Sequence, residues 1–416
     1  MNPILLQIPL DLPDVQIEAF DTESKKGIII KVQSTCKGTT CRQCHQPIDK
    51  FYGYGKEITL RHLPIFEQSV WIKIKPKRYQ CPYCDQGPTT TQRCSWYDQK
   101  SPHTKAYEQW ILRDLINSTI TDISIKRGIN EAAVEGIINR YIRQEVDWET
   151  IKSLPLLGLD EIALKKGHKD FVVIISGINE GGEKCILAVL PNRKKETVKI
   201  FLQSIPVEIK RTIQRACVDM YDGYSNAVYE ELYGVEVVVD RFHVTKSYRA
   251  CADNARIKEM KTLKKTLSSE DYAQLKGVMW LFRKSLWDLN EEQQIKLIQL
   301  FNYAPELKQI YIYREALTGI FNRPLSKSQA EAELNSWVEQ VRNLKLDCFN
   351  SFIVTLQNWQ HEITNYFLRR ETSGFVEGLN NKIKVIKRRC YGIYDIGRLF
   401  QHIWLDVEGR RLFGYA

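Results

Sequence analysis

The stretch Leu156-Leu-Gly-Leu-Asp-Glu-Ile-Ala163 decides how the rest of this chain is organised. It is short and apolar, with Pro155 before it and the basic run Lys165-Lys-Gly167 after it, a pattern typical of a buried strand rather than a helix. Asp160 interrupts the apolar run, and a carboxylate in such a position needs a partner or a metal ion. Glu161 should point to the opposite face, because side chains alternate along a strand.

Two further acids occupy comparable positions downstream. Asp219 follows the apolar run Ile213–Val218, and Glu377 lies in a stretch with helical periodicity. Carboxylate oxygens are the protein ligands that Mg²⁺ prefers. We therefore predict that the fold brings Asp160, Asp219 and Glu377 together around divalent metal.

The composition is that of an ordinary globular protein. The 416 residues are 43% hydrophobic and 26% charged, which suffices for two to four domains with cores of their own. Sixty Lys and Arg against 50 Asp and Glu give a net charge of +10, which is compatible with a polyanionic partner. The start of the sequence, Met1–Asp14, does not resemble a signal peptide, and no run approaches the ~18 apolar residues of a membrane span. We expect no membrane partner.

Six of the eleven cysteines lie between residues 36 and 94. They include two pairs with metal-binding spacing, Cys41-x2-Cys44 and Cys81-x2-Cys84. Two thiolates in a tight turn can hold one ion, and two such turns complete a tetrahedral zinc site. The spacing predicts one structural Zn²⁺ on Cys41, Cys44, Cys81 and Cys84. The alternatives are reduced structural cysteines, or the replacement of a ligand by Cys36, His45 or Cys94.

Residues 104–145 have helical periodicity. Asn130 follows a glycine turn at Gly128 and is a natural N-cap for a helix over Glu131–Arg143. A helix, a glycine turn and a second helix with outward polar residues is typical of a helix-turn-helix, although any small helical hairpin has the same pattern. We expect this segment to contact DNA through Asn139, Arg140 and Arg143.

From residue 156 the pattern changes to strands. Apolar runs at 156–163, 171–178 and 184–190 are followed by a helical stretch at 196–205, a strand at 213–219, a helix at 225–233 and a strand at 235–240. The order β-β-β-α-β-α-β, with acids at the ends of the first and fourth strands, is the ribonuclease H arrangement. Residues 244–370 are mostly helical. The basic stretch 241–265 is either a solvated helix face or a phosphate-binding surface.

Residues 374–392 carry the most specific signal. At about 100° per residue, Phe375, Leu379, Ile383 and Ile386 share one stripe of a helix. The opposite stripe holds an acid, an amide and two cations: Glu377, Asn381, Lys384 and Arg388.

These motifs resemble a DDE transposase of the ISL-three insertion-sequence family over nearly the whole chain. The cysteine pairs and the helix-turn-helix match the family's N-terminal modules. The remaining matches are Gly158-Leu-Asp-Glu161, Val218-Asp-Met220 with Tyr224, Asp240-Arg-Phe-His243, and Glu377-Gly-Leu-Asn-Asn-Lys-Ile-Lys384 with Lys387-Arg-Arg389 and Tyr391-Gly392.

The resemblance implies an α/β ribonuclease H-like catalytic core with a helical insertion, preceded by a small zinc-binding β domain and a helix-turn-helix. The expected domains are 1–100 (zinc-binding), 101–150 (helix-turn-helix), 151–243 (core, first part), 244–370 (insertion) and 371–416 (core, glutamate helix). Asp160, Asp219 and Glu377 would be the catalytic, magnesium-binding acids, with Asp240 and His243 as accessory residues.

The implied function is that of a transposase that binds terminal inverted repeats and catalyses DNA cleavage and strand transfer with Mg²⁺ or Mn²⁺. Asn381, Lys384 and Arg388 would hold phosphates. The resemblance also implies a homo-oligomer on DNA and a cytoplasmic, nucleoid-associated location. The alternatives are a transposase-derived, non-catalytic DNA-binding regulator, which would not need the three acids, and a structure-selective nuclease. Strand transfer with paired element ends would distinguish the transposase from the nuclease.

Overall fold

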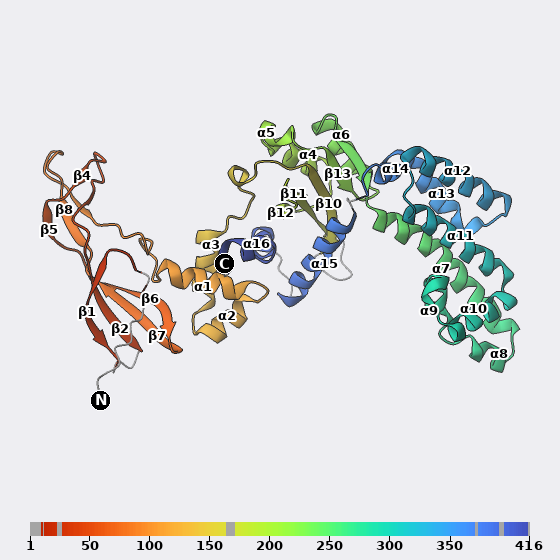
Figure 1. Cartoon of the computed structure of the whole chain (residues 1–416), viewed down its shortest axis with the longest axis horizontal. Coiled ribbons are helices and arrows are strands. Elements are labelled where there is room, and N and C mark those ends of the chain that lie inside the picture. Colours follow the sequence, from red (N-terminus) through yellow and green to blue (C-terminus); the bar gives the residue numbers. More distant parts are fainter. Residues whose placement is uncertain are drawn as a thin grey trace. The chain divides into compact units, whose positions relative to one another are not determined.

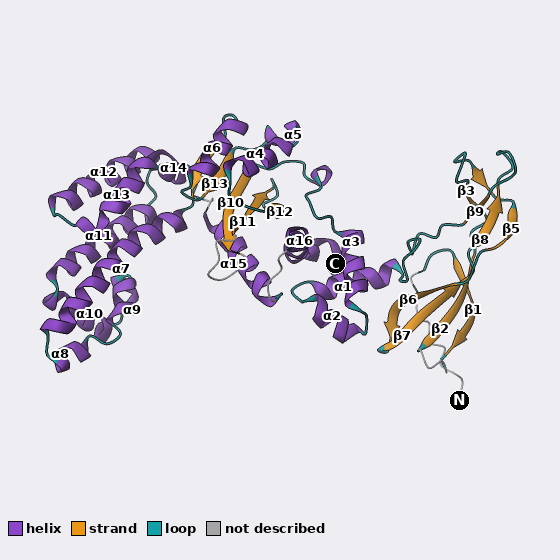
Figure 2. Cartoon of the chain, turned by 180° about the vertical axis from the view of Figure 1, so that it is seen from behind, coloured by secondary structure: helices purple, strands orange, loops and turns teal. Residues whose placement is uncertain are grey.

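The computed structural model describes residues 10, 12–22, 27–163, 171–370, 373–390 and 395–414, with only the backbone described for 373–377 and 380. The chain divides into two compact units. The first comprises Met1–Ile142 with Glu408–Ala416, and the second comprises Arg143–Val407. The elements of both units are shown in Figure 1 and, from behind, in Figure 2. None of the helices in these described ranges is both long and apolar enough to cross a membrane.

The first unit contains a four-stranded sheet within its described residues. The strands are ordered β1 (Val15–Asp21), β2 (Ile28–Ser34), β7 (Gln68–Ile74) and β6 (Ile58–Ile65). β2 and β7 are parallel, and the other two pairings are antiparallel. Alternate apolar side chains of β2 and β7, such as Ile30 and Ile72, are buried, as expected for a sheet with one face in a core.

Two small sheets hold the cysteine pairs. One consists of β3 (Thr39–Thr40) and β4 (Pro47–Ile48), and the other of β5 (Phe51–Tyr54), β8 (Lys77–Gln80) and β9 (Thr89–Thr91). The two strands that precede the second cysteine pair, β7 and β8, are separated by two residues and belong to different sheets. The second cysteine pair follows directly after β8.

The sheet is followed by helices α1 (Lys105–Leu115), α2 (Ile120–Arg127) and α3 (Glu131–Tyr141). Gly128 ends α2 with a left-handed φ of 55°, and the Asn130 side chain accepts a hydrogen bond from the Ala133 N–H. The predicted glycine turn and N-cap are confirmed. Helix α3 ends at Tyr141, two residues earlier than predicted, so that Arg143 follows the helix.

A buried carboxylate fastens these helices together. Glu108 of α1 is fully buried; it accepts a 2.7 Å hydrogen bond from the Ser101 hydroxyl and pairs with the Arg140 guanidinium of α3. His103 lies 3.6 Å from the same carboxylate. Burial raises the pKa of Glu108, but His103, Ser101 and Arg140 outweigh it, and the net pKa is lowered.

The second unit is built on a five-stranded sheet in the part of the chain that is described. The strands are ordered β12 (Lys184–Leu190), β11 (Phe171–Ile178), β10 (Leu156–Ala163), β13 (Arg215–Val218) and β14 (Glu236–Val239). β12, β11 and β10 pair antiparallel, whereas β10, β13 and β14 pair parallel. The first three strands have the predicted bounds.

Helices cover both faces of this sheet (Figure 1). α4 (Lys195–Ser204), α5 (Val207–Lys210) and α6 (Asp222–Glu231) pack on the face of Leu157 and Leu159. α15 (Ser373–Arg389) and α16 (Ile396–Phe413) pack on the other face, where Leu379, Ile383 and Ile386 join Ile162 in one cluster. Three members of the predicted apolar stripe are thus buried, and the side chain of Phe375 lies outside the described residues.

A helical segment separates β14 from α15. Its core begins on the sheet itself, because Val238 and Val239 of β14 belong to the same hydrophobic cluster as the buried side chains of the helices. The helices are α7 (Arg241–Thr266), α8 (Ser269–Gln274), α9 (Val278–Arg283), α10 (Glu291–Tyr303), α11 (Pro305–Asn322), α12 (Lys327–Asn343), α13 (Asn350–Asn358) and α14 (Gln360–Thr364).

The Glu108 network gives a prediction for stability. Glu108→Gln removes the negative charge beside Arg140 and should lower the stability of the first unit by about 1–3 kcal/mol. Because the folded pKa is lowered, the contribution of Glu108 is present above the unfolded pKa and is lost as the pH falls through the folded value. Thermal unfolding of the full chain at pH 7 measures the change. The exposed Glu18→Gln is the control; equal melting temperatures for the two variants would contradict the prediction.

Candidate active site and zinc site

The register of the parallel strands places two aspartates side by side. Gly158 of β10 lies opposite Cys217 of β13, and Asp160 and Asp219 each follow two residues later. Because parallel strands run in the same direction, both carboxylates lie at the same edge of the sheet. Glu161 points to the opposite face, as predicted, where it lies 3.4 Å from the Arg193 guanidinium.

Asp240 continues this row of acids. Val218 of β13 lies opposite Val239 of β14, so that Asp219 and Asp240 follow their strands at equivalent positions. Asp240 is buried and caps α7, accepting a 2.9 Å hydrogen bond from the Phe242 N–H. This cap fixes where the first turn of α7 begins and therefore where His243 lies.

His243 contacts the second aspartate. Its Nδ1 atom lies 2.9 Å from Oδ1 of Asp219. Burial raises the pKa of Asp219, but the hydrogen bond and charge of His243, the Met220 N–H and the charge of Lys246 together outweigh this effect, and the net pKa is lowered. Burial lowers the pKa of His243, but the hydrogen bond to Asp219 and the charges of Asp219, Asp160 and Asp240 together outweigh burial, so that its net pKa is raised.

Asp160 is shifted in the opposite direction. Burial raises the pKa of its carboxyl group, and this effect exceeds the opposing influence of His243 and of the Glu161 N–H, which donates a 2.6 Å hydrogen bond to Oδ1. Asp160, Asp219 and His243 each offer one ligand atom, and these atoms all lie within 4.8 Å of one another. The group is therefore compact enough to contact a single cation.

A buried hydroxyl beside the acids tests whether a hydrated cation fits here. Tyr224 of α6 is 1% exposed, and its hydroxyl has no hydrogen-bond partner among the described residues. Burial and the charges of Glu161, Asp160 and Asp219 raise its pKa, so that it stays protonated. Closely spaced carboxylates with an unpartnered hydroxyl next to them suit a cation that keeps bound water, as Mg²⁺ does.

Helix α15 lies beside the strand that carries Asp160. α15 contacts β10 and α7, and the Lys387 ammonium donates to the Ala163 carbonyl at the end of β10. Glu377 belongs to the first half of α15, but its side chain lies outside the described residues. Asn381, Lys384 and Arg388 are exposed, and the charge of Lys384 lowers the pKa of Asp160 in part.

The four cysteines of the two pairs come together in the first unit. The Sγ atoms of Cys41 and Cys84 are 3.9 Å apart, and those of Cys44 and Cys81 are 3.6 Å apart. All four lie within 4.8 Å of one another. A tetrahedron with Zn–S bonds of ~2.3 Å has S–S edges of ~3.8 Å, so the thiols already have the right spacing.

The ionisation of these thiols also suits a cation. Backbone N–H groups of Cys44 and Gln43 lower the pKa of Cys41 to about 6. Hydrogen bonding to Cys44, burial and the charge of Cys41 raise the pKa of Cys84 to about 12. Four thiolates cannot coexist at this distance without a positive charge, which Zn²⁺ supplies. Among the described residues, Cys36, His45 and Cys94 are not part of this cluster.

Comparison with known families gives matches to two parts of the chain. A family model described as transposase, of the ISL3 type, matches residues 157–403, which contain the sheet, the acids and α15. The chain belongs to this transposase family. A second model, described as the zinc-finger of transposase IS204/IS1001/IS1096/IS1165, matches residues 37–84 and includes the four clustered cysteines.

Two curated relatives are similar to this transposase over most of their length. The transposase for insertion sequence element IS1001 of Bordetella parapertussis is 27% identical, and the match covers 89% of this chain and 88% of the relative. The transposase for insertion sequence element IS1557 of Mycobacterium tuberculosis is 20% identical, with 96% and 93% covered. The solved Drosophila P element transposase strand transfer complex matches with 12% identity and a TM-score of 0.39, covering 77% of this chain and 94% of that one.

The candidate DNA-binding residues of the transposase differ in their surroundings. Asn139 and Arg140 are exposed residues near the end of α3, but the Arg140 guanidinium is engaged by the buried Glu108. Arg143 is exposed and lies 3.2 Å from Asp147. A change at Arg140 therefore alters the packing of the helices as well as any surface for DNA.

Sequence reasoning missed one cation near the acids. Lys246 lies one helical turn after His243 on α7, and its charge lowers the pKa of Asp219 in part. The i, i+3 spacing from His243 is the signal that would have found it, since such residues share a helix face.

The cysteine cluster predicts metal content. Purified full-length transposase should contain about one Zn²⁺ per chain, and Cys41→Ser with Cys81→Ser should remove it, because the two remaining thiols cannot complete a tetrahedral site. Elemental analysis after dialysis measures the zinc. Cys217→Ser, at a buried cysteine of the sheet, is the control and should retain it. Zinc at the wild-type level in the double variant would contradict the assignment.

Proposed function

We propose that the transposase is a DDE enzyme with a ribonuclease H-like core, in which Asp160, Asp219 and Glu377 hold two Mg²⁺ or Mn²⁺ ions. The observation that carries this proposal is the parallel register that sets Asp160 and Asp219 side by side. The helix of Glu377 contacts the strand of Asp160, which supports the third assignment. Bound Mg²⁺ would activate the attacking oxygen and stabilise the leaving oxygen of a phosphodiester.

The residues of the chain have separate tasks in this proposal. His243 holds the Asp219 carboxylate in place through the 2.9 Å contact and keeps it ionised. Lys384 and Arg388, on the exposed face of α15, would hold phosphates of the DNA together with Asn381. The buried Asp240 acts as the cap that positions His243 rather than as a third metal ligand.

The DNA substrates would be the terminal inverted repeats of an insertion sequence and then a target site. Water attacks the phosphodiester first and releases a 3′-hydroxyl at the element end, which then attacks the target strand. The two curated relatives are transposases for insertion sequence elements, which supports this substrate class. The net charge of +10 favours association with the DNA backbone.

The remaining parts of the chain would recognise the element ends. We propose the division into 1–100, 101–150, 151–243, 244–370 and 371–416, with α2, α3 and the Gly128 turn as the helix-turn-helix. Two copies of the chain would hold the two ends of an element, so we expect a homo-oligomer on DNA in the nucleoid.

The three acids give the central prediction. Asp160→Asn, Asp219→Asn and Glu377→Gln each remove a carboxylate while keeping the size of the side chain, and each should reduce cleavage of terminal-repeat DNA by 10³-fold or more. Binding of the same DNA should stay within about threefold, because the charge lost is one that repels phosphate. Cleavage should require Mg²⁺ or Mn²⁺ and cease in chelator. Strand-cleavage and strand-transfer assays on labelled DNA measure both steps.

Two other acids serve as controls for this series. Asp222→Asn, at the first residue of α6, should leave cleavage unchanged, whereas Asp240→Asn should lower it through His243 without abolishing it. Loss of all cleavage in Asp240→Asn while Asp219→Asn remains active would show that the second acid is misassigned.

The helix-turn-helix gives a prediction for binding. Arg143→Ala should weaken binding to the terminal repeat and reduce the slope of log affinity against log salt by about one, because one phosphate contact is lost. Arg140→Ala should weaken binding and also lower the melting temperature, because it removes the guanidinium that pairs with the buried Glu108 carboxylate. Arg211→Ala, at the exposed residue that follows α5, is the control. If residues 156–416 alone bind the repeat as tightly as the full chain, the modular assignment is wrong.

A further inference from the structure

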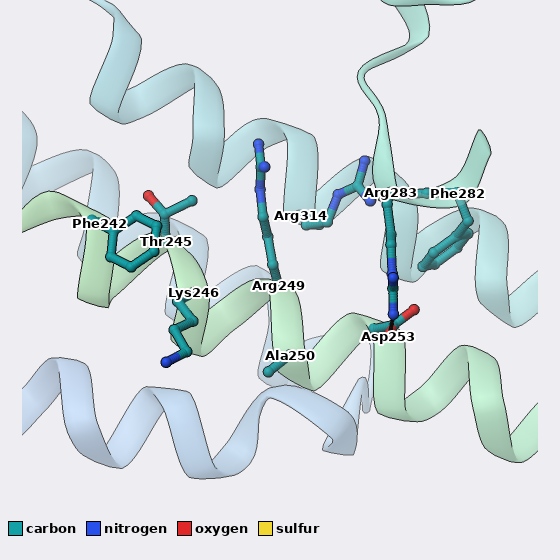
Figure 3. Close-up of a pocket in the computed structure, with 9 residues that line it drawn as sticks. All are labelled: Phe242, Thr245, Lys246, Arg249, Ala250, Asp253, Phe282, Arg283 and Arg314. Carbon is teal, nitrogen blue, oxygen red and sulfur yellow. Dashed lines mark hydrogen bonds and ion pairs between the residues drawn. The ribbon is translucent and has the colours of Figure 1, made fainter. Parts of the chain in front are cut away.

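A cavity of about 440 Å³ lies beside α7, on the helical segment that follows the sheet (Figure 3). Residues of α7, α9 and α11 line it. They include aromatic, small and cationic side chains: Phe242, Thr245, Lys246, Arg249, Ala250, Asp253, Phe282, Arg283 and Arg314. The acids and His243 of the proposed active site are not among them.

Two of the cationic side chains that line this cavity already make hydrogen bonds or ion pairs with neighbouring residues. Arg314 is 2% exposed, donates to the Lys284 carbonyl over 2.9 Å and pairs with Glu315 over 2.7 Å. Arg283 pairs with Asp253 over 2.5 Å. These contacts connect the end of α9 to α7 and α11 at one wall of the cavity.

Arg249 makes no contact of this kind among the described residues. It is exposed, and no hydrogen bond or ion pair engages its guanidinium among the described residues. Figure 3 shows Arg249 extending from α7 between Thr245 on one side and Arg283 and Arg314 on the other. An arginine presented in this way, next to other cations and one neutralised acid, attracts an anion such as phosphate.

The other lining groups suit a flat apolar body. Phe242 is 43% exposed at one end of the cavity, and the buried ring of Phe282 lies at the other. Trp280, which stacks on Arg283 with 5.5 Å between the guanidinium carbon and the ring centroid, is 62% exposed on the same short helix. Aromatic side chains beside cations are the combination by which proteins bind unpaired nucleotides, through base stacking and phosphate contacts.

The cavity and the proposed active site lie along the same helix. His243 lies in the first turn of α7, and Arg249 follows six residues later, about 9 Å along the axis at 1.5 Å per residue. This distance corresponds to roughly three nucleotides of one DNA strand at about 3.4 Å each. A strand whose phosphate lies at the acids can therefore reach Arg249 within a few nucleotides.

We propose that this cavity binds one unpaired nucleotide of the DNA strand that enters the active site, with its phosphate on Arg249 and its base against Phe242. The inference rests on the proposed function, because the strand is the one to be cleaved. The concave shape and the volume fit a single nucleotide, whereas a duplex, with its bases stacked inside, presents only its outer backbone. The transposase would thus open the DNA next to the cleaved bond and hold a displaced nucleotide.

Binding of two matched DNA substrates tests this inference on the full chain. One substrate is a terminal repeat with flanking duplex, and the other has three mismatched nucleotides beside the cleaved bond. Wild-type protein should bind the mismatched DNA about tenfold more tightly. Arg249→Ala should remove most of this preference and reduce the salt slope on the mismatched DNA by about 0.7, while its affinity for the paired DNA changes less than twofold. Arg249→Lys should keep part of the preference.

The base contact is tested separately by removing bases. Abasic nucleotides are placed one at a time at the mismatched positions, and fluorescence anisotropy gives each dissociation constant. For wild-type protein, one position should lose about fivefold in affinity, because stacking on Phe242 is lost. For Phe242→Ala the same abasic position should have no further effect. If the affinity losses caused by Phe242→Ala and by the abasic nucleotide add up, the proposed contact between Phe242 and the base is wrong.

Lys258→Ala is the matched control, since Lys258 is an exposed cation of α7 outside the cavity. If Arg249→Ala and Lys258→Ala behave alike on the mismatched DNA, or if Arg249→Ala weakens both substrates equally, the inference is overturned and Arg249 is an ordinary backbone contact. Metal-dependent cleavage by the wild-type chain, and its loss in Asp160→Asn, is measured on the same DNA. If the wild-type chain shows no metal-dependent cleavage, or if Asp160→Asn still cleaves, the proposed function is wrong. If cleavage behaves as expected but the Arg249 variants do not, only the inference about the cavity is wrong.

Discussion

The structure of the second unit depends on the parallel pairing of β10, β13 and β14. In a parallel pair the residues that follow the paired positions emerge on the same side, so the register that aligns Gly158 with Cys217 also aligns Asp160, which lies within β10, with Asp219, which follows β13. A slip of one residue would turn one of these carboxylates to the face occupied by Leu157 and Leu159. The apolar side chains that set the register therefore also set the geometry of the acids.

The sequence predicted this part of the fold well, for physical reasons. β10, β11 and β12 are continuous apolar runs because both faces of the sheet are covered, and their bounds could be read directly. Asp160 was recognisable because a carboxylate in such an apolar run is costly unless it has a partner or a metal ion. The cysteine pairs were recognisable because thiolate spacing is constrained by the zinc tetrahedron.

Other parts were not accessible from the sequence. β1 is mostly exposed and has no alternation of buried residues, so nothing marked it as a strand, although the alternation in β2 (Ile28, Ile30) could have been noticed. The parallel pairing of β2 with β7 joins segments some forty residues apart in the sequence, and no local pattern encodes it. The same holds for Arg140, whose outward position in the helix pattern gave no sign of the buried Glu108 that engages it.

The helical segment between β14 and α15 is more than a spacer between two acids of the proposed site. Val238 and Val239 of β14 lie in its hydrophobic core, and the Asn365 side chain donates a 2.7 Å hydrogen bond to the Val237 carbonyl. These contacts cover β14, which is the last strand of the sheet and would otherwise expose unpaired backbone groups. Because α7 continues directly from β14, its first turn carries His243 to Asp219 while its later turns build the core of the segment. The same helix therefore belongs both to the core of the segment and to the contact with the second aspartate.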